Sequence, residues 1–395
     1  MKKNQLSLAV AATAAGLASA AYADMYVNAD GSGEALIFPF YSAQSNNQTY
    51  VNVINTTSHY KAVKVRVREG QAGEETADLN VYMGPRDYFS FGIVADDDSD
   101  GARIVSGDST CTVPAIGDLQ NALFSDETRE TIGTIEAIEM GQIDAAGPVA
   151  GWIASGDCEA LTSAWGSDGA WTADAATGFA ASWSGGGLIG TATVVNSEAG
   201  TGVGFDAAAV ADMVSAGSSG SALHYAPSAD GPTCSDASIA GDVAALFKAK
   251  DLANDYTTET ALAALTDWVV AMPFGNDSCK SVSLSVYNRA GESPDVTPPA
   301  SINLCDTVNV VHFGGASATK SSTNLVNASG YRADTGADAN GSAIMDLTGE
   351  DASGLPAIGF SVVQFTNGTL EDSDGNSVLA NYQQAWEHKT LVTSS

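Results

Sequence analysis

Residues 33–70 read GEALIFPFYSAQSNNQTYVNVINTTSHYKAVKVRVREG, and this stretch decides the fold. It holds three apolar runs, Ala35–Tyr41, Tyr50–Ile54 and Ala62–Val67. The short segments between them are rich in Ser, Asn, Gln and Thr, which favour turns because they hydrogen-bond their own backbone. The sequence therefore predicts three consecutive strands.

The third run has the clearest period of two, because valines alternate there with Lys64, Arg66 and Arg68. Successive side chains of a strand point to opposite faces, so the valines are expected in the core and the cations in solvent. Two interpretations of this cationic stripe stay open. It is a solvated face paired with neighbouring acids, or it is a contact for the acidic surface of another copy, which would give self-association.

Two further alternating runs, Ala77–Met83 and Tyr88–Val94, follow after short polar turns. Five short strands without long connections favour antiparallel pairing, since a parallel sheet needs crossover helices. The predicted fold class is mainly β, an antiparallel β-sandwich-like architecture with short helical insertions.

Four segments are expected along the chain. Residues 1–23 form a signal peptide, and residues 24–110 form an N-terminal antiparallel β region. Residues 111–267 form a mixed insertion with short helices and Gly/Trp-rich loops. Residues 268–395 form a C-terminal β region that packs with residues 24–110.

Within the insertion, residues 148–184 are rich in Gly, Ala, Ser and Trp, which predicts loops that close over a core. Three alanine-rich segments have leucine or valine at helical spacing and predict satellite helices. They are Ala207–Val214, Ile239–Ala253 and Thr258–Leu265.

The N-terminus predicts export. Two lysines precede an alanine-rich apolar run, and Ala21-Tyr22-Ala23 fits a signal cleavage site. The rest of the chain has no apolar run of about 18 residues, so no transmembrane segment is expected. With 47 acidic against 16 basic residues, the chain should repel nucleic acid and attract divalent cations. We expect an extracellular or cell-surface protein, with the periplasm as the alternative.

Five cysteines in an exported chain predict disulfides. Pairing of nearest neighbours would join Cys111 to Cys158 and Cys279 to Cys305, and it leaves Cys234 over. The sequence alone does not fix this connectivity.

An acidic turn is the candidate metal site. Asp96, Asp98, Asp100 and Gly101 match the first half of a calcium loop, in which oxygens at alternate positions surround the ion and glycine makes the bend. The second half does not match, because Gly107 stands where a bidentate glutamate is required. The alternative is a solvated acidic turn between strands. Calcium is the only cofactor that the sequence suggests.

Motifs for catalysis are absent from the sequence. Residues 185–190, GGGLIG, contain GxGxxG, but a strand rather than a helix is expected to follow, which favours a plain glycine turn. Neither HExxH nor GxSxG occurs. We therefore expect that the protein is not an enzyme, with a secreted hydrolase as the third-ranked function.

Seven blocks of sequence carry a resemblance to a known family. They are GEALIFPFY, YVNVINTTSHYKAVKVRVREG, ADLNVYMGPRDYFSFGI, TCTVP, GGGLIGTATVVN, LTDWVVAMPF and LPAIGFSVVQFTNGTL. The chain resembles a proteobacterial family of exported proteins described as cell-surface or hypothetical proteins. The resemblance implies export and surface association, and it brings no activity or functional residues.

The predicted function is that of an exported structural or interaction protein that self-associates. Its expected partners are other copies of itself or cell-surface components. The alternative is a calcium-assisted glycan-binding module or adhesin, with glycans as partners.

Overall fold

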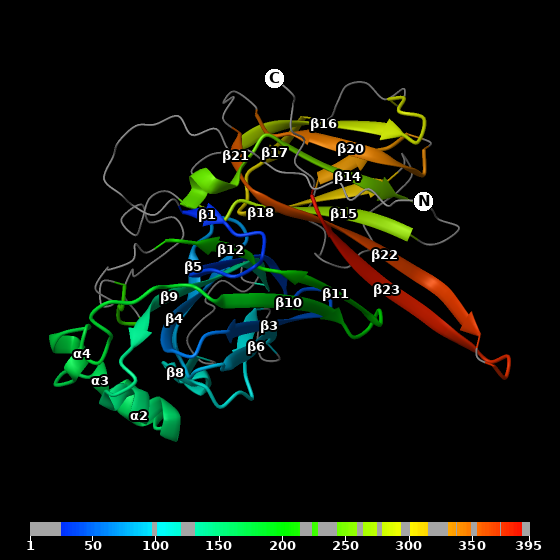
Figure 1. Cartoon of the computed structure of the whole chain (residues 1–395). Coiled ribbons are helices and arrows are strands. Elements are labelled where there is room, and N and C mark those ends of the chain that lie inside the picture. The colour runs from blue at the N-terminus through cyan, green and yellow to red at the C-terminus, as the bar shows by residue number, and fades with distance from the viewer. Residues whose placement is uncertain are drawn as a thin grey trace, which may run out of the picture.

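The computed structural model shows two β-sandwiches that pack against each other (Figure 1). The structure describes residues 25–96, 101–119, 131–213, 223–227, 243–258, 264–274, 279–293, 301–314, 331–336, 338–348, 354–371 and 373–388. The predicted signal peptide lies outside these ranges. Strands dominate the described chain, so the predicted mainly-β, sandwich-like fold class is confirmed.

The N-terminal sandwich consists of a seven-stranded and a five-stranded antiparallel sheet. The larger sheet has the order β1 (Tyr26–Val27), β12 (Ala208–Ala211), β2 (Ala35–Ser42), β9 (Ile132–Ile143), β4 (Tyr60–Glu69), β5 (Glu75–Met83) and β8 (Cys111–Val113). The smaller sheet has the order β11 (Thr201–Asp206), β10 (Leu188–Asn196), β3 (Asn47–Asn55), β6 (Tyr88–Ala95) and β7 (Ala102–Val105).

The five strands predicted from the opening of the sequence form as β2 to β6. They do not make a meander, because β2 pairs with β9 and β12 while β3 pairs with β6 and β10 in the opposite sheet. Alternate side chains of the two sheets, among them Leu36, Val53 and Val65, meet in one buried core. Removal of this apolar surface from water is the main source of stability in such a sandwich.

The C-terminal sandwich consists of a four-stranded and a five-stranded sheet. The first has the order β14 (Asp251–Thr257), β20 (Asn340–Asp346), β16 (Lys280–Asn288) and β17 (Ser301–Leu304). The second has the order β19 (Tyr331–Asp334), β18 (Val308–Gly314), β15 (Ala264–Ala271), β22 (Ile358–Glu371) and β23 (Ser377–Glu387). The pair β18 and β19 is parallel, and the other pairs are antiparallel. Its core centres on Trp268, whose ring packs 4.9 Å from that of Phe313.

An apolar layer joins the two sandwiches. Phe40 of β2 packs edge-on against Phe360 of β22 at 6.1 Å, and Phe205 of β11 stacks on the same Phe360 at 4.8 Å. Beside this layer, η2 (Val243–Phe247) and the two-strand pair β13 (Lys248–Ala249) and β21 (Leu355–Pro356) extend the contact.

Short helices cover one end of the outer face of the seven-stranded sheet (Figure 1). They are α2 (Pro148–Ser155), α3 (Cys158–Ala164) and α4 (Ala170–Ala173), while α1 (Ile116–Leu119) packs near β7. Gly156, with φ of 70°, ends α2 in the left-handed region, and the Asp157 carboxylate caps α3 by accepting from the Ala160 amide. The prediction of loops in this segment is therefore wrong, although its tryptophans do supply core bulk.

The predicted segment boundaries differ from those of the two sandwiches. Strands β8 to β12, which lie between residues 111 and 211, complete both sheets of the N-terminal sandwich rather than forming an insertion. Strands β14 and β15 begin the C-terminal sandwich before residue 268. The described parts of the three alanine-rich segments that predicted helices form β12, η2, β13, β14 and the first residues of β15, so that prediction is wrong apart from the single 3-10 turn.

Candidate functional site

The cationic stripe lies on the outer face of the seven-stranded sheet and is buried. The exposed fraction of the side chain is 0% for Lys64, 2% for Arg66 and 15% for Arg68. The prediction that this face is solvated is wrong, and the three cations are not placed to contact a second copy. The physical reason is that later parts of the chain cover the sheet: the main chain of residues 223–227 lies on Lys64.

Each cation of the stripe pairs with an acid on a neighbouring strand. Asp78 accepts from Lys64 Nζ at 2.9 Å and Arg66 Nη2 at 3.1 Å, and Arg68 lies 3.7 Å from Glu136. The antiparallel register sets Arg66 opposite both Asp78 and Glu136. Burial raises the pKa of Asp78 to about 6 and lowers that of Lys64, because both charges lose water. The stripe is therefore part of a buried ion layer.

The segment 223–227 is held on this face by backbone and ring contacts. Lys64 Nζ donates to the Ala226 and Pro227 carbonyls at 3.1 and 3.2 Å, and Asn80 Nδ2 donates to the Tyr225 carbonyl at 2.8 Å. The carbonyls replace part of the water that the ammonium loses on burial.

His224 belongs to a hydrogen-bonded relay inside an aromatic cluster. Trp165 Nε1–H donates to the Tyr82 hydroxyl at 3.0 Å. His224 Nδ1 is 2.9 Å from the Ala175 carbonyl, so it carries the proton, and Nε2 accepts from the Tyr82 hydroxyl at 3.0 Å. Burial lowers the pKa of His224 to about 3. The imidazole is thus fixed in its neutral form, which suits a structural role.

The candidate calcium loop lies mostly outside the described residues, since Asp98 and Asp100 are not among them. Asp96 is described, and its carboxylate is 3.9 Å from Arg103 Nε. Within the described ranges no three acidic, histidine or cysteine side chains gather as a metal site. Calcium binding by this loop stays a prediction.

Both predicted disulfides form. Cys111–Cys158 ties β8 to α3, and Cys279–Cys305 ties the start of β16 to the end of β17. Cys234 lies outside the described residues. The glycine run 185–187 also behaves as expected, because it turns directly into strand β10.

An open groove runs along the hairpin of β22 and β23, and we call it the hairpin groove. Its volume is about 560 Å³. The walls come from β14, the turn after β16, β20 and the hairpin, and they include Asp255, Arg289, Gln384 and Trp386. Figure 1 shows the hairpin reaching from the C-terminal sandwich past β10 and β11. Asn381 Nδ2 fastens it there by donating to the Ala199 carbonyl at 2.9 Å.

One face of β23 presents aromatic rings to solvent. Tyr382 and Trp386 are each 51% exposed, and the exposed Gln384 lies between them on the same face. The Tyr382 ring stacks at 4.5 Å on Phe365 of β22, which holds it in place. The opposite face of β23 packs inward, with Ala385 against the apolar layer between the sandwiches.

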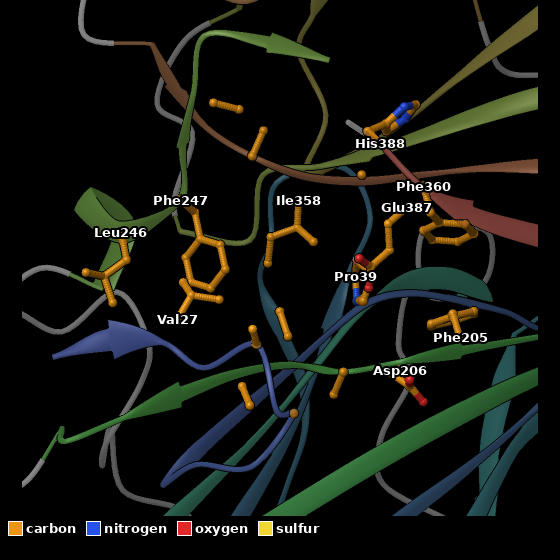
Figure 2. Close-up of a pocket in the computed structure, with 18 of the residues that line it drawn as sticks. Val27, Pro39, Phe205, Asp206, Leu246, Phe247, Ile358, Phe360, Glu387 and His388 are labelled. Atoms are coloured by element: carbon orange, nitrogen blue, oxygen red, sulfur yellow. The ribbon is translucent and has the colours of Figure 1, made fainter. Parts of the chain in front are cut away.

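A second hollow, the inter-lobe pocket, opens between the two sandwiches and has a volume of about 810 Å³. Its larger apolar lining residues come from both sandwiches and include Val27, Pro39, Phe205, Phe247, Ile358 and Phe360. Figure 2 shows Phe247 and Val27 at one end and Phe205 and Phe360 at the other, with Glu387 reaching down beside Pro39. His388 also lines it, and its ring packs 4.6 Å from that of Trp268.

Neither hollow was predicted as a site from the sequence. Strand β23 does carry a sequence signal, because Tyr382, Gln384 and Trp386 alternate with Asn381, Gln383 and Ala385. The signal does not say which face stays uncovered. The other walls come from β14, β16, β20 and β22, which are spread over more than 100 residues of the chain, and only the fold brings them together.

Comparisons with known proteins give no match to a family model, a curated protein or a solved structure. Among the described residues, no helix is long and apolar enough to span a bilayer.

Proposed function

We propose that this protein is an exported, cell-surface glycan-binding protein that holds its ligand in the hairpin groove. The observation that carries the proposal is the exposed row of Tyr382, Gln384 and Trp386 on one face of β23. Gln384 and Trp386 line the groove, and Tyr382 stands on the same strand face and stacks on Phe365, another lining residue. Exposed aromatic side chains at a hollow with polar walls are typical of binding surfaces rather than of an inert sheet.

The chemistry of the groove fits sugar rings. A pyranose ring has an apolar face of C–H groups that packs flat on Trp or Tyr, and hydroxyls around its edge that need hydrogen-bond partners. Asp255, Arg289 and Gln384 are exposed in the groove and together offer acceptors and donors. From Tyr382 to Trp386 the strand advances about 13 Å, which suits a chain of sugar units better than a single ring.

Charge narrows the class of glycan. The chain has a net charge of −31, and Arg289 is the only cation among the described residues that line the groove. Sulfated or uronic glycans would therefore be repelled over distances of about a Debye length. We expect neutral glycans.

Export rests on the predicted signal peptide, and the two disulfides are compatible with an oxidising compartment. Self-association as a structural component was the first expectation from the sequence. Lys64 and Arg66 are buried and Arg68 is only 15% exposed, so the residues on which self-association depended are not available to a second copy. Glycan binding has a surface in the described structure that fits it.

The test is binding of the mature chain, residues 24–395, to an array of neutral and anionic glycans, followed by calorimetry with the best ligand. The variants Trp386→Ala and Tyr382→Ala should each weaken binding about tenfold, because each removes a stacking surface. Titration with and without EDTA reports separately on the predicted calcium loop.

Tyr88→Ala is the matched control, since Tyr88 is 59% exposed on β6 in the other sandwich. It should leave the affinity unchanged. The proposal is wrong if no neutral glycan binds, or if the Trp386→Ala and Tyr382→Ala variants bind as well as the wild type. If the protein forms ordered polymers and binds no glycan on the array, the structural role becomes the better explanation.

A further inference from the structure

We infer that the inter-lobe pocket is a second binding site, for an amphipathic organic cation: an amine or quaternary ammonium group on an aromatic or branched aliphatic body. This site is separate from the hairpin groove, so the inference does not depend on glycan binding. Strand β23 divides the two, because Trp386 lines the groove while its neighbour Glu387 lines the pocket.

The shape and lining of the pocket fit the apolar body of such a ligand. A volume of about 810 Å³ is in the range of small-molecule sites, which often lie between lobes. Large apolar side chains reach in from β1, β2, β11, η2 and β22. Alanines of β12, β13 and β23, and those directly before β12 and β22, leave the space between them open. A small apolar molecule would remove these surfaces from water.

The end of the pocket near Phe205 has the side chains that would bind the charged group of the ligand. The rings of Phe205 and Phe360 stack there at 4.8 Å, and Figure 2 shows the Glu387 side chain extending toward Pro39 next to them. Asp206, which is exposed, follows Phe205 directly and also lines the pocket. An ammonium group between a carboxylate and aromatic rings gains both ion pairing and cation–π attraction.

The opposite charge lies elsewhere in the pocket. Apart from the neutral His388, Lys248 is the cationic residue among the described residues that line the pocket. It follows Phe247 in the chain, and Figure 2 shows Phe247 at the end of the pocket away from Phe205. A cation is therefore expected to bind in one orientation, with its charge toward Glu387. The acidic surface of the whole chain adds a long-range attraction for cations.

Three probes that share one apolar body test the assignment by calorimetry on the intact mature chain. They are 4-phenylbutylamine as the cation, 4-phenylbutanol as the neutral form and 4-phenylbutyrate as the anion. We expect affinity to fall in that order, with the cation about fivefold tighter than the alcohol, since one ion pair near the surface is worth about 1 kcal/mol.

Glu387→Gln should remove most of the preference for the amine, a loss of about fivefold, and leave the alcohol unchanged. Phe205→Leu keeps the pocket apolar and should weaken the amine about threefold through loss of cation–π attraction. Glu159→Gln on α3 makes the same change of net charge at an exposed site far from the pocket, and it should have no effect.

Circular dichroism before each titration shows that a variant is folded. The inference is overturned if none of the three probes binds at 10 mM, if the alcohol and the amine bind equally, or if Glu159→Gln weakens the amine as much as Glu387→Gln. Loss of glycan binding in Trp386→Ala with amine binding intact would show that the two sites are independent.

Discussion

Strands β4 and β23 have the same alternating pattern and opposite surroundings. In β4 the valines face the core of the N-terminal sandwich, and Lys64 and Arg66 on the other face lie beneath other parts of the chain. In β23 Ala385 packs inward while Trp386 stands in solvent. The pattern of a strand shows that its two faces differ, but whether the second face stays exposed depends on segments far away in the sequence.

The two faces also differ in what a substitution should cost. Charges in a covered ion layer depend on every partner, because a buried charge without its counter-ion is expensive. Half-exposed aromatic rings on an open hairpin bury less surface in the folded state, so their removal should cost little free energy of unfolding. The contrast predicts large effects on stability at β4 and β5 and small ones at β23.

Asp78→Ala should have the largest effect. The change leaves Lys64 and Arg66 without the carboxylate that accepts from both, and removal of one partner from a buried pair costs about 3–5 kcal/mol of the free energy of unfolding. Urea denaturation of the wild type and the variant measures it. Asp118→Ala, at an exposed aspartate, should change stability by less than about 0.5 kcal/mol. A loss below 1 kcal/mol in Asp78→Ala would mean that this face is solvated after all.

His224 should make the free energy of unfolding depend on pH in the acid range. Its folded pKa of about 3 lies below that of an unfolded histidine, so below about pH 6.5 the unfolded chain binds a proton that the folded chain does not. Stability is therefore lost as pH falls. Between pH 6.5 and pH 5 the wild type should lose about 1.5 kcal/mol more than His224→Gln.

Urea titrations at several pH values measure this difference. His59→Gln is the control, since His59 is exposed in a turn and should leave the slope unchanged. Equal slopes for the wild type and His224→Gln would show that the imidazole is not held neutral. In that case the relay from Trp165 through Tyr82 would not form as described.

Trp386→Ala should have the smallest effect on stability, about 0.5 kcal/mol or less, because the side chain is half exposed. Thermal unfolding compares it with Trp171→Ala, which removes a ring that is 2% exposed and should cost about 3–5 kcal/mol. Similar losses of stability in the two variants would contradict the difference between the exposed face of β23 and the covered outer face of the seven-stranded sheet.

Strands with strong alternation were predictable from the sequence, as β2 to β6 show. The alanine-rich segments were not, because helix propensity is a weak prior that tertiary contacts override. Ala209, for example, sits in β12 next to β2 with its methyl group in the core, where a small side chain fits between the sheets.

The two disulfides were predictable because nearest-neighbour pairing happens to be correct. The hollows were not, since their walls come from strands far apart in the chain. The Lys64 stripe illustrates the same limit: its acidic partner Asp78 was visible in the sequence, but the covering residues 223–227 lie about 160 positions away.

The packing of Phe40 and Phe205 against Phe360 has a consequence for how the protein folds. Phe40 and Phe205 of one sandwich and Phe360 of the other cover one another, so separation of the two sandwiches would expose apolar rings on both. The hairpin that carries Phe360 follows every strand of the N-terminal sandwich in the chain, so it is synthesised after them. Until the C-terminal strands are in place, the N-terminal half exposes this apolar patch, and we therefore expect the two sandwiches to unfold as one cooperative unit.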